Sequence, residues 1–128
     1  MGGGIRGEGS FLKRGELWWA DLGPYRPMEQ TGSRPVVIWQ SDALTRVLQS
    51  VLVVPLTTNL SRANLVGTAT ITALPRVGPP DDSVALAFQL RAIPKSALRS
   101  KIRDLTPSES DELELATDEA LGRINPRA

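Results

Sequence analysis

Cysteine and histidine are both absent from this chain of 128 residues. Without cysteine the chain can form neither a disulfide bond nor a thiolate metal site, which favours a cytoplasmic setting. Without histidine it lacks the commonest acid–base catalyst and the commonest metal ligand. Any catalysis must therefore use other side chains, and we expect no cofactor.

Long apolar runs are missing as well. No stretch approaches the roughly 18 consecutive apolar residues of a membrane-spanning helix, and no secretory signal pattern is present, so we expect no membrane association. The length suits one domain with its own core. Residues 1–10 are rich in glycine and show no periodicity. We therefore expect a disordered segment over residues 1–12 and a single domain over residues 13–128.

The charge of the chain is nearly balanced but unevenly placed. The net charge is +1. Residues 1–103 contain 13 Lys or Arg against 7 Asp or Glu, whereas residues 104–128 contain 2 against 7. A basic body of this kind is compatible with a polyanionic partner. An ordinary solvated surface with an acidic helix explains the same numbers, so charge only supports an argument from motifs.

Two apolar runs rich in β-branched residues, residues 34–40 and 50–56, form the densest hydrophobic sequence. Such runs are typical of strands buried on both faces. Further strands are expected at 16–22, 68–74 and 83–93. In the first of these, alternation places Trp18, Ala20 and Leu22 on one face and Trp19 on the other. Trp18 is the expected core residue. Trp19 is expected in a dimer interface or on a partly covered surface, with stacking on a base as the alternative.

The connections carry turn and helix signals. Residues 23–33 and 59–67 read as polar loops, and loops as long as the first tend to be functional. A helical turn capped by Ser41 or Asp42 is expected near residues 41–46. Residues 94–104 are expected to form a short helix or turn, with an inner side made of Ala97, Leu98 and Ile102.

The last helix has the clearest start signal. Thr106 and Glu109 fit a capping box with Pro107 at the first helical position. Apolar residues then recur at helical spacing, which predicts the inner face to be Leu113, Ala116, Ala120, Leu121 and Ile124. The predicted fold class is mainly β (α+β), a strongly twisted antiparallel sheet or small barrel with a C-terminal helix.

Candidate site residues lie where the two central strands meet loops. Arg34 begins one strand, and Thr57 and Thr58 end the other. A guanidinium donates paired hydrogen bonds to phosphate, and a threonine hydroxyl adds a further donor. A surface salt bridge and ordinary strand chemistry are the plainer explanations of these residue types. Asp81 and Asp82 are explained as turn formers after two prolines, so they do not indicate a metal site.

Three correctly spaced blocks give the sequence a specific resemblance. Residues 29–38 (EQTGSRPVVI), residues 53–58 (VVPLTT) and the upstream RGELW and DLGP segments resemble the MazF/PemK (Kid) family of toxin endoribonucleases. The resemblance spans roughly residues 13–103. It implies an SH3-like barrel, a homodimer, and metal-independent, sequence-specific cleavage of single-stranded RNA to 2′,3′-cyclic phosphate and 5′-hydroxyl ends. It also implies a cognate antitoxin with an acidic, partly disordered inhibitory segment.

The resemblance implies that Arg34 and Thr57 form the catalytic pair. Because arginine stays protonated at neutral pH, we assign Arg34 to stabilising charge on the phosphoryl group, and Glu29 becomes the candidate proton acceptor. We expect RNA contacts from five further polar residues, Gln30, Arg26, Thr58, Arg62 and Gln89. The sequence departs from the family pattern at Phe88 and Pro94, where the family often has acids.

Two other functions remain as alternatives. A gyrase-inhibiting toxin of the CcdB type would share the fold, but that group depends on a C-terminal tryptophan motif that this chain lacks. A non-catalytic SH3-like binding module would need neither Arg34 nor Thr57. Such a module usually presents more aromatic side chains than the 5% found here.

Overall fold

The computed structural model describes residues 12–24, 26–72 and 82–125. The expectations for residues 1–11, for the end of the strand at 73–74 and for Asp81 fall outside this range. Leu12, which we assigned to the disordered segment, is instead buried and packs in the core. No helix in the described part of the chain is long and apolar enough to cross a membrane.

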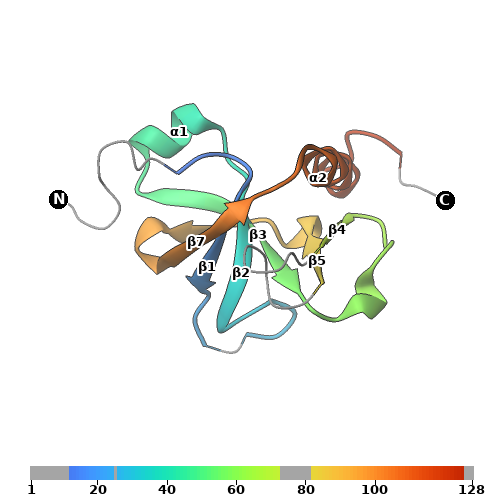
Figure 1. Cartoon of the computed structure of the whole chain (residues 1–128), viewed down its shortest axis with the longest axis horizontal. Coiled ribbons are helices and arrows are strands. Elements are labelled where there is room, and N and C mark those ends of the chain that lie inside the picture. The colour runs from blue at the N-terminus through green and yellow to red at the C-terminus, as the bar shows by residue number, and fades with distance from the viewer. Residues whose placement is uncertain (1–11, 25, 73–81, 126–128) are drawn as a thin grey trace.

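The chain forms a twisted antiparallel sheet with one long helix beside it (Figure 1). Hydrogen-bonded neighbours follow the order β4-β5-β3-β2-β1-β7, and β6 pairs with β3. The strands are β1 Glu16–Asp21, β2 Ser33–Ile38, β3 Ser50–Thr57, β4 Thr68–Ile71, β5 Ser83–Leu86, β6 Arg91–Pro94 and β7 Leu98–Asp104. The helices are α1 Asp42–Val47 and α2 Pro107–Ala120, with 3-10 turns η1 Leu60–Arg62, η2 Ala87–Gln89 and η3 Lys95–Ala97. The expected fold class is thereby confirmed.

The central strands β2 and β3 are buried on both faces, as their unbroken apolar runs predict. Alternate residues of each strand enter two different core clusters. Val37, Val54 and Leu56 belong to the cluster that Leu113 and Ala116 of α2 complete. The other cluster contains residues from β1, β2, β3, β6 and β7. The sheet is thus the middle of the molecule, and loops at its ends are free to form a site.

In β1 the expected alternation is confirmed. Ala20 and Leu22 are buried in the second cluster, and the half-buried Trp18 packs against it. The indole Nε1 of Trp18 donates to Glu16 Oε1 at 2.9 Å. Trp19 is also half-buried and stands opposite Pro35 of β2 and Ser100 of β7.

Residues 83–93 do not form the single strand that we expected. The 3-10 turn η2 separates β5 from β6. Both strands pair with β3, β5 at Leu56 and Thr57 and β6 at residues 50–53. The break therefore lies opposite Val54 and Pro55, and proline has no N–H to donate to a neighbouring strand.

The expected helix or turn over residues 94–104 is also wrong. Only η3 is helical there, and β7 continues as a strand that pairs with β1. Pairing along the edge of β1 outweighs the local preference. The inner side is close to the expected one, because Leu98 is buried and Ala97 and Ile102 are half-buried.

The C-terminal helix begins as predicted and packs differently. The Thr106–Glu109 capping box is complete, with Pro107 at the first position. The apolar inner face ends early, since Leu113 and Ala116 are buried whereas Ala120, Leu121 and Ile124 are exposed. α1 likewise has the expected cap, in which Ser41 accepts a hydrogen bond from the Leu44 N–H.

Three glutamates explain the packing of α2. β4 is an outer strand of the sheet, and its outward backbone N–H groups need acceptors. Side chains of α2 supply them. The bonded pairs are Glu109 Oε2 with the Thr72 N–H (3.0 Å), Glu112 Oε2 with the Thr70 N–H (3.0 Å) and Glu119 Oε1 with the Gly67 N–H (3.1 Å). Carboxylates therefore occupy part of the inner face of α2, for which apolar spacing alone predicted only apolar side chains.

Candidate functional site

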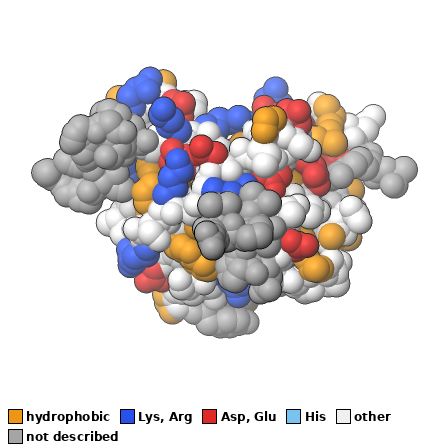
Figure 2. Space-filling view, in the orientation of Figure 1, with side chains coloured by type: hydrophobic (Ala, Val, Ile, Leu, Met, Phe, Trp, Pro, Cys, Tyr) orange, Lys and Arg blue, Asp and Glu red, His pale blue; other side chains and the backbone are white. Residues whose placement is uncertain are grey.

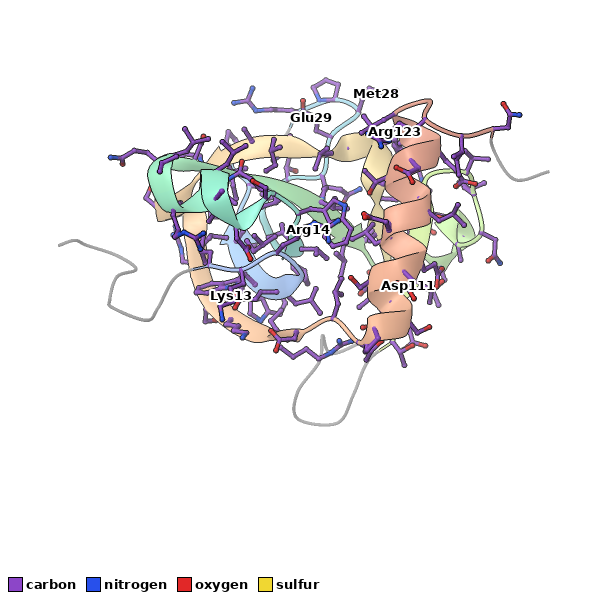
Figure 3. All side chains as sticks on the ribbon, turned by 90° about the horizontal axis from the view of Figure 1, so that it is seen from above. Lys13, Arg14, Met28, Glu29, Asp111 and Arg123 are labelled. Carbon is purple, nitrogen blue, oxygen red and sulfur yellow. The ribbon has the colours of Figure 1, made fainter. Side chains whose placement is uncertain are left out.

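A cavity of about 350 Å³ lies between the β1–β2 loop and the turns η1 and η2. Its lining contains five of the eight residues singled out from the sequence, together with two apolar side chains. The lining residues are Arg26, Met28, Glu29, Gln30, Arg62, Phe88 and Gln89. Figure 3 shows Met28 and Glu29 on their loop, at the opposite side of the view from Lys13 and Asp111. Three segments far apart in the sequence thus meet at one place.

The base of the β1–β2 loop is closed by its own backbone. Gly32 N–H donates to the Gly23 carbonyl oxygen at 2.9 Å, and Leu22 N–H donates to the Gly32 carbonyl oxygen at 2.9 Å. Both glycines have positive φ, +88° at Gly23 and +76° at Gly32, a conformation that strains other residues. Met28 also has a positive φ and, at 92%, is the most exposed large apolar side chain among the described residues. The loop therefore has a fixed base and an open tip.

Three interactions tie the loop and its base to the segment after β5. The Gln30 N–H donates to Oε1 of Gln89 at 2.9 Å. Nη1 of Arg91 forms an ion pair with Oε1 of Glu29 at 3.1 Å, and Nη2 of Arg91 donates to the Leu22 carbonyl oxygen at 3.2 Å. Arg91 is therefore a positioning residue that sequence reasoning left out of the site. Its place at the end of an expected strand was the available signal.

The other wall is the short turn η1. Asn59 caps it, because its side-chain oxygen accepts from the Ser61 N–H at 3.2 Å. Arg62 ends this turn with its side chain exposed, and Arg26 is exposed on the opposite loop. Glu29, the one carboxylate among the described lining residues, is already paired with Arg91. The local balance of charge therefore favours an anion.

That balance is local rather than a property of a whole face. Figure 2 shows acidic and basic side chains interspersed over the side of the molecule that it displays. A second cavity of about 340 Å³ has both signs of charge in its wall. There Lys101 Nζ pairs with Asp104 Oδ1 at 3.0 Å and with Glu16 Oε2 at 3.3 Å. The hydrogen bond to Asp104, helped by Glu16, raises the pKa of Lys101. The carboxylates of Asp104 and Glu16 offset the positive charge of Lys101, so this second cavity attracts an anion less strongly.

Arg34 and Thr57 are not among the residues that line the cavity. Nε of Arg34 donates to the Thr31 carbonyl oxygen at 2.9 Å, which orients the guanidinium. Thr57 is buried at the end of β3, and its Oγ1 accepts from the Asn59 N–H at 3.1 Å. β2 and β3 pair through Val36 and Pro55, and the same register extended by two residues places Arg34 across from Thr57. Thr58, the next residue, is exposed and also outside the lining.

Phe88 and Met28 are the apolar lining residues that sequence reasoning did not assign to the site. Phe88 was noted only as a departure from the family pattern, because we expected a continuous strand there and did not predict the turn η2, which leaves Phe88 exposed.

Among the described residues, no three acidic side chains gather as a group that could hold a metal ion.

Known proteins resemble this chain over most of its length. A family described as PemK-like, MazF-like toxin of type II toxin-antitoxin system matches residues 13–121. Endoribonuclease EndoA of Bacillus subtilis (strain 168) is 38% identical over 115 residues, which are 90% of this chain and 98% of EndoA. Endoribonuclease MazF of Staphylococcus epidermidis is 33% identical over 115 residues, 90% of this chain and 95% of that protein.

Solved structures agree with this assignment. An endoribonuclease in complex with its cognate antitoxin, from a mycobacterial species, superposes with a TM-score of 0.70 at 25% identity, over 90% of this chain and 99% of that one. MazF from Deinococcus radiodurans, at 22% identity, shares the fold with a TM-score of 0.69 over 88% of this chain and 97% of its own. With both the sequence match and the fold in agreement, the chain belongs to the PemK-like, MazF-like toxins of type II toxin–antitoxin systems.

Proposed function

We propose that this toxin is a metal-independent endoribonuclease that cuts single-stranded RNA at specific sequences. One observation carries the proposal. Residues from three separate segments, chosen from the sequence as RNA contacts, line a single cavity, and two of them, Arg26 and Arg62, are exposed cationic side chains. The relatives named endoribonucleases support the same activity.

The proposed reaction uses the RNA's own 2′-hydroxyl as nucleophile. The 2′-oxygen attacks the adjacent phosphorus, the bond from phosphorus to the 5′-oxygen breaks, and the departing 5′-oxygen takes a proton from water, which gives a 2′,3′-cyclic phosphate and a 5′-hydroxyl. Arg34 stabilises the charge on the phosphoryl oxygens, since its Nε is bonded to Thr31 and its terminal nitrogens carry the remaining N–H donors. Thr57 Oγ1 accepts from the Asn59 N–H, which leaves its own hydrogen to donate to a phosphoryl oxygen.

Glu29 is the proposed proton acceptor for the 2′-hydroxyl. Arg91 holds its Oε1, so Oε2 is the oxygen assigned to take the proton. RNA would extend from the catalytic pair into the cavity. There Arg26 and Arg62 meet phosphates, and Gln30, Gln89 and the nearby Thr58 supply polar contacts.

The test is cleavage of a long single-stranded RNA in excess EDTA. We expect cutting by the unaltered protein, and a rate lower by roughly 100- to 1000-fold for Arg34→Ala and for Thr57→Val, which each remove one charge-stabilising donor. Arg46→Ala, an exposed arginine on α1, and Thr70→Val on β4 are the matched controls and should cut normally. A 2′-deoxy nucleotide at the cut site should block the reaction. If both variants cut normally, or the deoxy site is cut, the mechanism is wrong.

The partners proposed are an antitoxin and a second copy of the chain. Solved relatives include a complex with a cognate antitoxin. An acidic antitoxin segment would meet the same positive charges as RNA, with the half-buried Trp19 offering an apolar contact, so RNA and antitoxin should compete. A titration of non-cleavable RNA against protein saturated with antitoxin tests this. Unchanged RNA affinity would contradict it.

The proposed homodimer is tested by analytical sedimentation at several protein concentrations.

A further inference from the structure

The exposed ring of Phe88 is one of two apolar side chains of the cavity that the catalytic scheme leaves unused. An aromatic ring offers a flat apolar face to a ligand. Phe88 is 46% exposed and lines the cavity beside polar and cationic side chains. It does not belong to either core cluster. Its position therefore suits a ligand that is flat and apolar on its faces and polar at its edges.

The turn η2 holds this ring in place. The Ala87 N–H donates to the Gly67 carbonyl oxygen at 2.9 Å, and the Leu90 N–H closes the turn onto the Ala87 carbonyl oxygen at 3.1 Å. A Cβ at Gly67 would lie 3.2 Å from Cδ2 of Phe88, and Gly67 has a φ of +80°. The ring thus rests against a backbone that only glycine allows to come so close. A ring supported from behind is a preorganised surface.

The neighbouring glutamine is also oriented. The Gln30 N–H can only donate, so the atom of the Gln89 amide facing it at 2.9 Å must be the oxygen. Nε2 is therefore the half of the amide left to donate to a ligand. The Gln30 side chain lines the same cavity and can both donate and accept. Polar amide edges thus stand next to an aromatic face.

We propose that the cavity takes one unpaired base of the RNA, stacked on Phe88 and distinguished from other bases by the amides of Gln89 and Gln30. This inference rests on the proposed function and identifies a specificity-determining residue within that site. Unpaired bases are recognised in this way, by stacking on an aromatic ring and hydrogen bonding at their edges. Arg26 and Arg62 suit the flanking phosphates.

The test begins with the cut site, mapped on long RNA with the unaltered protein. A short RNA carrying that sequence and a 2′-deoxy nucleotide at the cut site then measures binding alone. Phe88→Ala should bind about 5- to 150-fold more weakly, the range seen when one stacking contact is lost. Phe88→Tyr keeps the ring and should bind nearly normally. Leu44→Ala, which removes an equally exposed side chain from α1, is the matched control and should have no effect.

An abasic scan identifies the base. Removing each base in turn should reveal one position where the unaltered protein loses more affinity than Phe88→Ala does, because only the unaltered protein loses stacking there. Equal losses by both proteins at every position would overturn the stacking. So would an affinity of Phe88→Ala within twofold of the unaltered protein, which would leave the ring to a protein partner. Melting temperatures check that each variant folds.

Gln89→Glu tests the amide. The carboxylate still accepts from the Gln30 N–H, while the donor facing the cavity is lost. At the position found by the scan, bases that present acceptors should bind more weakly relative to bases that present donors. Unchanged preference would overturn the role of Gln89. If the unaltered protein neither cuts nor binds RNA, the proposed function itself fails. If it cuts RNA and only the Phe88 results are negative, this inference fails alone.

Discussion

The carboxylate of Glu109 is predicted to be the most important polar group for the stability of this fold. It accepts four hydrogen bonds. The donors are Nη1 and Nη2 of Arg103 (2.8 and 3.0 Å) and the N–H groups of Thr106 (2.9 Å) and Thr72 (3.0 Å). Its ion pair with Arg103 has side-chain exposures of only 8% and 9%. Glu109 therefore joins the start of α2 to β7 and to the end of β4.

Glu109→Ala should lower the free energy of unfolding by about 3–5 kcal/mol, because it leaves the Arg103 charge buried without its partner. For a chain of this size the loss corresponds to a melting temperature roughly 10–20 °C lower. The matched control is Glu114→Ala on the same helix. Glu114 pairs with Arg14 at 2.6 Å but is 57% exposed, so its loss should cost about 0–1 kcal/mol.

The same site predicts a dependence on pH. Burial alone would raise the pKa of Glu109, but the hydrogen bonds from Arg103, Thr106 and Thr72 outweigh it and hold the pKa below the usual 4.5. A carboxyl group with a lowered pKa stabilises the fold fully above its unfolded pKa, and the contribution is lost as pH falls through the folded value. The stability difference between Glu109→Ala and the unaltered protein should therefore be constant near neutrality and shrink below about pH 4.5.

Thermal melts at one protein concentration, over a series of pH values, measure both effects. The double change Arg103→Met, Glu109→Leu should recover part of the lost stability, because it removes the unpaired charge. The recovery should be incomplete, because the two backbone N–H groups that Glu109 accepted from still lack an acceptor. A Glu109→Ala protein that melts within about 3 °C of the unaltered one would refute the argument. A stability difference that persists undiminished at pH 3 would refute the assigned role of the carboxylate's charge.

Two further predictions concern the loop and the sheet edge. Arg91→Leu should lower kcat and raise KM for RNA together, because it frees both the proposed proton acceptor Glu29 and the Leu22 carbonyl oxygen at the base of the binding loop. Steady-state cleavage kinetics measure both constants, and unchanged values would count against the positioning role. Glu112→Ala removes the acceptor of the Thr70 N–H on outer strand β4. Amide hydrogen exchange at Thr70 should become faster by about 10-fold, because a hydrogen bond of about 1–1.5 kcal/mol is lost. Equal exchange rates would show that the side chain does not protect the edge.

The amino-acid sequence alone determined the centre of the fold and the ends of its helices. The runs at 34–40 and 50–56 are apolar at most positions and contain three β-branched residues each, so burial on both faces could be expected from composition. The Thr106–Glu109 box and the Ser41 cap depend on residues three apart, and that local chemistry survives in the folded protein. The resemblance to toxins was likewise in the order and spacing of short motifs, which folding does not alter.

Only the tertiary structure decided the features that depend on partners far away in the sequence. The break at η2 follows from β3, which offers two separate stretches to β5 and β6 around Pro55. The glutamates of α2 that accept hydrogen bonds from Thr70 and Thr72 follow from the position of the helix along outer strand β4, and no periodicity within the helix could reveal them. Arg91 joined the site because a loop 62 residues earlier placed Glu29 within reach. Each of these features depends on hydrogen bonds between distant segments, whereas a sequence pattern reflects only the conformational preferences of residues close together in the chain.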